Sequence, residues 1–260
     1  MFVTKTLDNE IEQFWPKNGP PIHEVEKYVK KYSKEKIVIK CGGRVLLDQA
    51  LLNSLIEDVV ILKKLGLTPI LVHGGGLGIK KKLDEQNIKS KFIMGLRVTD
   101  KKMVKIVESV MTKFNEEIVN KLDEKNCKAK SITIKKNNLI YVEQENKELG
   151  FVGKPKRIDV KLLKEVIKED FVPVIIPMGL DNIGNQYNIN ADTAAGAIAT
   201  AIKSRRLMLL TDIDGVLDNE NKLISEINIM QAKELVKNKT IHGGMTVSYT
   251  HLTLPTNREV

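Results

Sequence analysis

The sequence is poor in several features that mark particular protein classes. Its two cysteines, Cys41 and Cys127, lie far apart and have no CxxC spacing, so we expect reduced thiols. The start of the chain contains acids and lacks the apolar segment of a secretory signal, and no apolar stretch approaches the length of a membrane span. These absences favour a cytoplasmic protein without a membrane partner.

Aromatic residues make up only 5% of the chain, and no platform for stacking nucleic acid bases is visible. The net charge of +9 comes mostly from lysines spread through helical segments. Such a pattern is typical of a solvated surface, and its positive field favours small anionic substrates over nucleic acid. The phosphate-binding loop GxxxxGK followed by Ser or Thr is missing, and Gly76 and Gly78 are followed by Lys81 instead of the third glycine of the dinucleotide pattern.

What the sequence does contain is a repeated order of strand, glycine loop and helix. The strand KIVIK (36–40) precedes Gly42–Gly43 and a helix over 49–65, and the strand TPILV (68–72) precedes HGGGLG and a helix over 79–87. This order predicts an α/β fold with a parallel sheet covered by helices. At 260 residues, the chain suits one large domain or two lobes sharing a sheet.

The rest of the chain continues the alternation. Further helices are expected over 23–33, 101–122 (with Thr99 or Asp100 as N-cap), 159–169, 191–203 and 228–237. Strands are expected over 171–177 and 206–212, and SITI (131–134) and LIYVE (139–143) predict a hairpin around Asn137–Asn138.

Two glycine loops are candidate anion sites. Lys40 ends a strand at the sheet edge where ligands bind, and Gly42 and Gly43 let the backbone approach an anion. The three glycines Gly74 to Gly76 lead into a helix N-terminus, which favours negative charge. The alternatives are a surface lysine and a tight turn, and His73 is expected to be a core or turn histidine.

Three further stretches have chemical potential. Arg97 in GLRVTD suits bidentate capture of a carboxylate, unless it is an ordinary surface arginine. Asp192 in NINADTAAGAIA either caps the helix or holds a lysine or metal near a transferred phosphate. The acidic turn in LLTDIDGVLD suits nucleotide or Mg²⁺ contacts, or is merely solvated.

In their order, these stretches resemble the amino-acid kinase superfamily from about Ile22 to Met245. Within it, GLRVTD and NINADTAA resemble the N-acetylglutamate kinases, which phosphorylate the side-chain carboxylate of N-acetylglutamate with MgATP in the arginine pathway. The resemblance implies a three-layer αβα sandwich around a mostly parallel central sheet.

The resemblance also implies roles for individual residues. Lys40 would neutralise the transferring phosphoryl group, Gly43 and Gly75 would donate N–H bonds to it, and Asp192 would orient the lysine. The acyl substrate would contact Gly75, Gly76, Arg97 and Asn188, and ATP, carrying Mg²⁺, would contact Thr211, Asp212, Gly215 and Leu217. No base is needed, because the attacking carboxylate is ionised near pH 7.

The C-terminal stretch departs from this family. The family motif GGM-x-x-K has Ser248 in place of its lysine, and Val247 to Thr256 resembles the translation of a sequencing-library adapter. We therefore expect an N-terminal extension (1–21), an acyl-substrate lobe (22–180), a partial nucleotide-binding lobe (181–246) and a non-native tail (247–260). This chain would then be impaired in stability and activity.

Two other functions stay open at this point. One is a related kinase acting on another acid of aminoadipate type, on aspartate or on carbamate. The other is an inactive acetylglutamate-binding subunit, which Ser248 alone supports. The resemblance further implies a homodimer, or a hexamer formed through the N-terminal helix.

Overall fold

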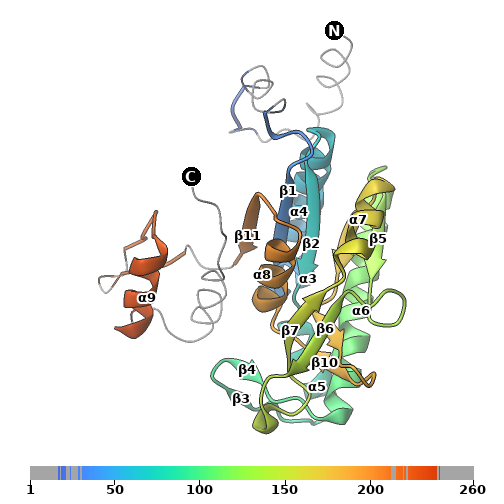
Figure 1. Cartoon of the computed structure of the whole chain (residues 1–260), viewed down its shortest axis with the longest axis vertical. Helices are drawn as coiled ribbons and strands as arrows, with labels where there is room; N and C mark the ends of the chain where they lie inside the picture. The colour runs from blue at the N-terminus through green and yellow to red at the C-terminus, as the bar shows by residue number, and fades with distance from the viewer. Residues whose placement is uncertain are drawn as a thin grey trace.

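The computed structural model describes residues 17, 19–21, 24, 29, 31–211, 215–218, 220, 222–238 and 240 (Figure 1). Its strands are β1 (Lys36–Cys41), β2 (Thr68–His73), β3 (Phe92–Ile93), β4 (Leu96–Arg97), β5 (Ala129–Ile132), β6 (Ile140–Gln144), β7 (Gly153–Ile158), β8 (Val172–Ile175), β9 (Met178–Leu180), β10 (Gln186–Asn188) and β11 (Arg206–Leu210). Its helices with described bounds are α3 (Gly43–Leu47), α4 (Gln49–Lys64), α5 (Gly76–Glu85), α6 (Lys101–Glu124), α7 (Val160–Lys168), α8 (Ala191–Ala201) and α9 (Ile229–Lys237).

The centre of the molecule is a five-stranded sheet in the order β11-β1-β2-β8-β5, and its strand pairs are all parallel. Its inner strands are short apolar runs, as expected for strands buried on both faces. A second sheet, in the order β10-β9-β6-β7, and the two-stranded β3-β4 ribbon lie toward the lower end in Figure 1. The predicted α/β fold with a mostly parallel central sheet is confirmed.

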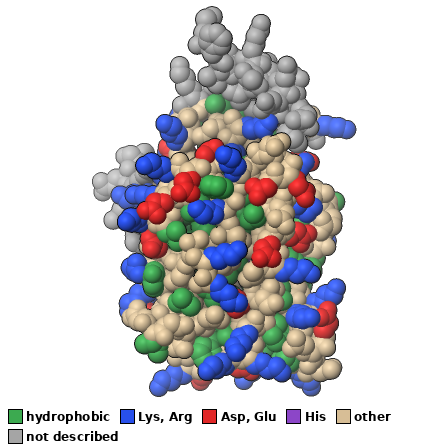
Figure 2. All heavy atoms as spheres, turned by 90° about the vertical axis from the view of Figure 1, so that its right-hand side faces the viewer, with side chains coloured by type: hydrophobic (Ala, Val, Ile, Leu, Met, Phe, Trp, Pro, Cys, Tyr) green, Lys and Arg blue, Asp and Glu red, His purple; other side chains and the backbone are tan. Residues whose placement is uncertain are grey.

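The surface in Figure 2 mixes Lys and Arg with Asp and Glu over most of its area. Several lysines pair with acids, among them Lys156 with Glu143 and Lys130 with Glu169. Lys and Arg side chains are more frequent at the lower edge of this face. No helix within the described ranges combines the length and apolar character that spanning a bilayer would take.

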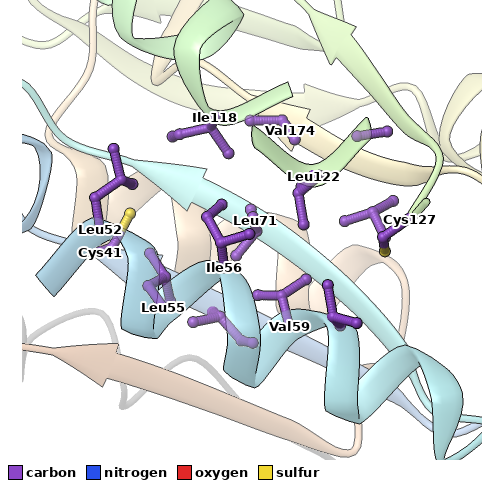
Figure 3. Packing of buried hydrophobic residues seen from close by; sticks show 14 of the residues in the cluster. Cys41, Leu52, Leu55, Ile56, Val59, Leu71, Ile118, Leu122, Cys127 and Val174 are labelled. Carbon is purple, nitrogen blue, oxygen red and sulfur yellow. The ribbon is translucent and has the colours of Figure 1, made fainter. Parts of the chain in front are cut away.

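Alternation along β1 separates two cores. Ile37, Ile39 and Cys41 face α4 and α6, whereas Val38 faces the opposite layer with α7 and α8. Figure 3 shows the first core, where Leu52, Ile56 and Val59 of α4 lie opposite Ile118 and Leu122 of α6. Helices therefore cover both faces of the sheet, which confirms the three-layer arrangement.

Short polar side chains start the helices. Asp100 accepts from the N–H groups of Lys102 and Met103 at the start of α6, so of the two expected N-caps it is Asp100 that caps. Thr99 is buried and donates its hydroxyl to the carbonyl of Arg97. This bond ties the end of the β3-β4 ribbon to the start of α6.

The predicted hairpin between 131–134 and 139–143 is wrong. β5 pairs in parallel with β8 at the edge of the central sheet, whereas β6 pairs with β7 and β9 in the second sheet. The two segments are adjacent in sequence but belong to different sheets. β5 joins the central sheet, where its residues are buried in the cores on the two faces.

Several boundaries also differ from the expected ones. The helix expected over 79–87 begins at Gly76, inside the glycine run, and the strands expected over 171–177 and 206–212 end at Ile175 and Leu210. Of the helix expected over 23–33, the described residues Glu24, Val29, Lys31 and Tyr32 are helical. The expected tail 247–260 lies outside the described residues.

Candidate functional site

A pocket of about 230 Å³ opens at the carboxyl ends of β1 and β2. Parallel sheets place ligands at this edge, because the loops after neighbouring strands meet there. The pocket brings together all the residues predicted for phosphoryl transfer and acyl binding. These are Lys40, Gly43, Gly75, Gly76, Arg97, Asn188 and Asp192.

Lys40 and Asp192 form an ion pair inside the pocket. The Nζ of Lys40, at the end of β1, lies 2.8 Å from Oδ1 of Asp192 on α8, and the two side chains are only 15% and 13% exposed. Asp192 does not cap its helix, since the Asn190 side chain accepts from the N–H groups of Asp192 and Thr193. The carboxylate therefore pairs with Lys40 and holds the ammonium group at the pocket.

The two glycine loops meet in the pocket. A Cβ on Gly43 would lie 3.2 Å from the backbone N of Gly76 and of Leu77, so the first loop abuts the start of α5. A Cβ on Gly75 would lie 2.7 Å from Sδ of Met111, whereas one on Gly76 would meet nothing within 4 Å. A side chain at Gly43 or Gly75 would therefore crowd its neighbours, whereas Gly76 leaves open space beside the helix N-terminus.

Arg97 reaches the pocket from the β3-β4 ribbon. Its guanidinium donates to Ser90 Oγ and, at 3.3 Å, to the carbonyl of Gly76, and it stacks 4.7 Å from the ring centroid of Phe92. Burial lowers the pKa of Arg97, and Asp84 partly offsets this, but a guanidinium stays charged at neutral pH. Within the described part of the chain, the guanidinium hydrogen-bonds and stacks with neutral groups, so its charge is available to an anionic ligand.

Asn188 lines the pocket from β10. Its backbone N–H donates to the carbonyl of Phe151 at 2.9 Å, and Asn188 forms a bridge with Val152. On its other side β10 pairs with β9, where Asn188 is in register with Met178, so the side chain is presented by a strand held on both sides.

The described residues that are expected to contact nucleotide lie outside this pocket. Thr211, Gly215 and Leu217 are not among the residues that line this pocket, and Asp212 lies outside the described residues. Thr211 nevertheless follows β11, whose last residue Leu210 is in register with Cys41. Thr211 therefore continues the same sheet edge beside the Gly42–Gly43 loop.

Some residues in the pocket or beside it were not found from the sequence. Phe92 and Ser90 support Arg97, and Met111 and Val152 add apolar wall. The ribbon has only two residues per strand, too few for a period-two pattern. The one local signal of its turn is Gly95. In the structure Met94 and Gly95 both have positive φ (49° and 81°), as a two-residue hairpin turn requires.

Comparisons with known proteins identify the family. Residues 35–259 match the amino acid kinase family. The chain is 57% identical over 243 residues to the acetylglutamate kinase of Pelagibacter ubique, covering 94% of this chain and 84% of that protein. The chain belongs to the amino acid kinase family.

A second relative supports this assignment, and a solved structure shares the fold. The acetylglutamate kinase of Caldanaerobacter subterraneus subsp. tengcongensis is 43% identical, over 84% of this chain and 75% of that protein. The solved structure of smu.665 from Streptococcus mutans UA159 is similar with a TM-score of 0.77 at 26% identity, covering 83% of this chain and 88% of that one. As an amino acid kinase, the chain is a phosphotransferase, and this class implies ATP as the donor.

Proposed function

We propose that this kinase transfers the terminal phosphoryl group of ATP to the side-chain carboxylate of N-acetyl-L-glutamate, a cytoplasmic reaction of arginine biosynthesis. The observation that supports this most is the single pocket shared by the Lys40–Asp192 ion pair, both glycine loops and the charged Arg97. A dianionic acid with one carboxylate to be held and one to react fits such a pocket.

The chemistry needs positioning more than proton transfer. A glutamate side chain has a pKa of about 4.3, so the nucleophile is an anion at neutral pH and needs no general base. The obstacle is the approach of two anions, which neutralisation and alignment in the pocket relieve.

Lys40 is proposed to supply the positive charge on the transferring phosphoryl group. Asp192 keeps the ammonium in place without acting as a base, because the two groups are already paired at 2.8 Å. The N–H groups of Gly43 and Gly75 are proposed to donate to the same phosphoryl oxygens, where negative charge builds up in the transition state.

Arg97 is proposed to bind the α-carboxylate of the acyl substrate. The contacts with Ser90, Phe92 and Gly76 restrict the guanidinium before the substrate arrives, which lowers the entropy lost on binding. Asn188 and the open space at Gly76 are proposed to complete the acyl site.

The nucleotide is proposed to extend from the glycine loops toward Thr211, Asp212, Gly215 and Leu217. Mg²⁺ is proposed to arrive on the ATP phosphates, where it would neutralise charge. The pocket's own carboxylate is engaged with Lys40, which favours an ion carried by the nucleotide.

The proposal is tested by a phosphorylation assay with ATP and four acids: N-acetylglutamate, aspartate, carbamate and an aminoadipate derivative. We expect turnover of N-acetylglutamate alone. The assay is run on two proteins: the 260-residue chain, and a version whose sequence after Met245 is taken from a new reading of the gene. Both are needed because the sequence predicts that the 260-residue chain is impaired. Turnover of another acid without N-acetylglutamate would overturn the proposal.

The assembly is also a proposal: a homodimer, or a hexamer that uses residues 1–21 and the helix that follows. Light scattering of the protein with and without residues 1–21 tests it. We expect the dimer to survive this deletion, and a monomer in both forms would contradict it.

A further inference from the structure

His73 ends β2 directly before the glycine loop and is fully buried. Both of its ring nitrogens have a partner. Nδ1 lies 3.0 Å from the carbonyl oxygen of Gly74, and Nε2 lies 3.2 Å from the side-chain nitrogen of Asn115 on α6. One imidazole therefore joins the glycine loop to α6, one of the helices that cover the sheet.

The position of the imidazole proton follows from a third group. The Asn115 nitrogen also donates to the carbonyl of Val174 on β8, at 2.9 Å. A carbonyl only accepts, so the Asn115 amide must turn its NH₂ group toward both Val174 and Nε2. Nε2 is then an acceptor, and Nδ1 bears the hydrogen and donates it to Gly74. Burial lowers the pKa of His73 to about 4, so the ring is neutral at pH 7.

This arrangement orients one peptide group. The Gly74 carbonyl and the Gly75 N–H belong to the same planar trans peptide and point in opposite directions. The N–H of Gly74 is itself bound to the carbonyl of Cys41 at 2.8 Å, which holds the loop from the other side. With its carbonyl turned toward the buried imidazole, the peptide turns the Gly75 N–H away from His73. Gly75 lines the pocket.

We propose that His73 and Asn115 form a positioning unit, which turns the peptide between Gly74 and Gly75 so that its N–H points at the transferring phosphoryl group. The identity of that anion rests on the proposed function. Neither residue touches the substrate. Asn115 acts on His73, His73 acts on the Gly74 carbonyl, and only the Gly75 N–H meets the ligand.

A purely structural explanation fits less well. The carbonyl oxygen of Asn115 is buried and has no hydrogen-bond partner among the described residues. Buried unsatisfied oxygens are destabilising and uncommon, and a leucine would fill the volume without one. Tautomer control gives a reason for an amide at this position.

The first test compares two variants of similar polarity. The amide nitrogen of His73→Asn replaces Nδ1, whereas that of His73→Gln replaces Nε2. We expect His73→Gln to lower kcat by about 10–100-fold with KM values for ATP and N-acetylglutamate changed by less than about threefold, because the lost bond strengthens in the transition state. His73→Asn keeps a donor for Gly74 and should retain most of kcat. Equal losses in both, or losses confined to KM, would overturn the proposal.

The second test reads the tautomer directly and needs no activity. In ¹⁵N-histidine-labelled protein at pH 7, NMR should show His73 as the Nδ1–H tautomer, and Asn115→Leu should shift it toward a mixture. An Nε2–H tautomer or an imidazolium in the unmodified chain would overturn the proposal. If no form of the protein phosphorylates N-acetylglutamate, the proposed function fails, and the NMR result still decides whether the unit exists.

Discussion

At the scale of single residues, the two cationic side chains of the pocket differ in their partners. Lys40 is paired with a carboxylate, whereas Arg97 contacts neutral groups. Lys40 and Asp192 come from β1 and α8 and meet at 2.8 Å. Arg97 is held by neutral groups and keeps its charge for a ligand. This asymmetry predicts that Asp192 matters through Lys40 and not through the substrate.

A double-mutant cycle checks this dependence. Lys40→Met should lower kcat by about 10²–10³-fold, because it removes the positive charge that is proposed to neutralise the transferring phosphoryl group. Asp192→Asn alone should lower kcat by less, and in the Lys40→Met background it should have little further effect. Steady-state kinetics of the four proteins measures the coupling. Additive losses would show that Asp192 has a separate role.

The buried His73 predicts a loss of stability in acid. Its pKa falls from the ordinary 6.5 to about 4 on folding, so between these values the unfolded chain binds a proton that the folded chain excludes. Above about pH 6.5, the neutral His73 has no effect of this kind on stability. As the pH falls from there to about 4, the free energy of unfolding decreases by about 3 kcal/mol. Urea unfolding of the protein and of His73→Asn across this range isolates the effect. Parallel pH curves for the two proteins would contradict it.

At the scale of elements, the first turn of α5 combines a tightly packed glycine with a glycine that lines the pocket. Gly78 contacts α6 so closely that a Cβ would lie 2.5 Å from the ring of Phe114, whereas Gly76 faces open space. Two glycines on one helix thus have different reasons to be glycine.

Alanine substitution should separate these reasons. Gly78→Ala is expected to lower the free energy of unfolding by about 1–3 kcal/mol through overpacking, although alanine usually favours a helix over glycine. Gly76→Ala should change stability by less than about 1 kcal/mol but raise KM for N-acetylglutamate about 10-fold or more, because a methyl group would enter the ligand site. Denaturation and kinetics of both variants check this. The opposite assignment of effects would place the ligand elsewhere.

At the scale of the whole molecule, the positive charge is uneven. The chain has a net charge of +9, and residues 79–113 alone contain ten Lys and Arg against four Asp and Glu. These residues form most of α5, the β3-β4 ribbon and the first half of α6, toward the lower end of the molecule in Figure 1. Several of them, including Phe92 and Arg97, line the pocket. Such a field attracts anionic substrates to this end.

The field predicts a salt-dependent rate. We expect kcat/KM for N-acetylglutamate to fall several-fold between about 0.01 and 0.15 M ionic strength, as the screening length drops from about 30 Å to about 8 Å. Reversing the exposed Lys80 and Lys81 to Glu should reduce kcat/KM and its salt dependence. The matched reversal of Lys161 and Lys164 on α7 should do neither. Equal effects of the two pairs would rule out local steering.

Much of the fold and of the pocket was predictable from short stretches of sequence. Periodicity marked β1, α4, β2 and the long α6, and the glycine loops after β1 and β2 indicated the sheet edge where Lys40 and the Gly74–Gly76 run would meet. These signals are local, since apolar spacing, caps and breakers act between residues that are close along the chain. The ordered motifs also indicated the family.

Only the tertiary structure decided which distant groups pair. The sequence left open whether Asp192 caps a helix or holds a lysine, and the packing of α8 beside β1 made it the partner of Lys40. It missed the ribbon that holds Arg97, and it joined β5 to β6, which the two sheets separate. The role proposed for His73 depends on Asn115 and Val174, from α6 and β8. Strand order and burial bring these groups together, and neither can be read from the neighbours of a residue in the sequence.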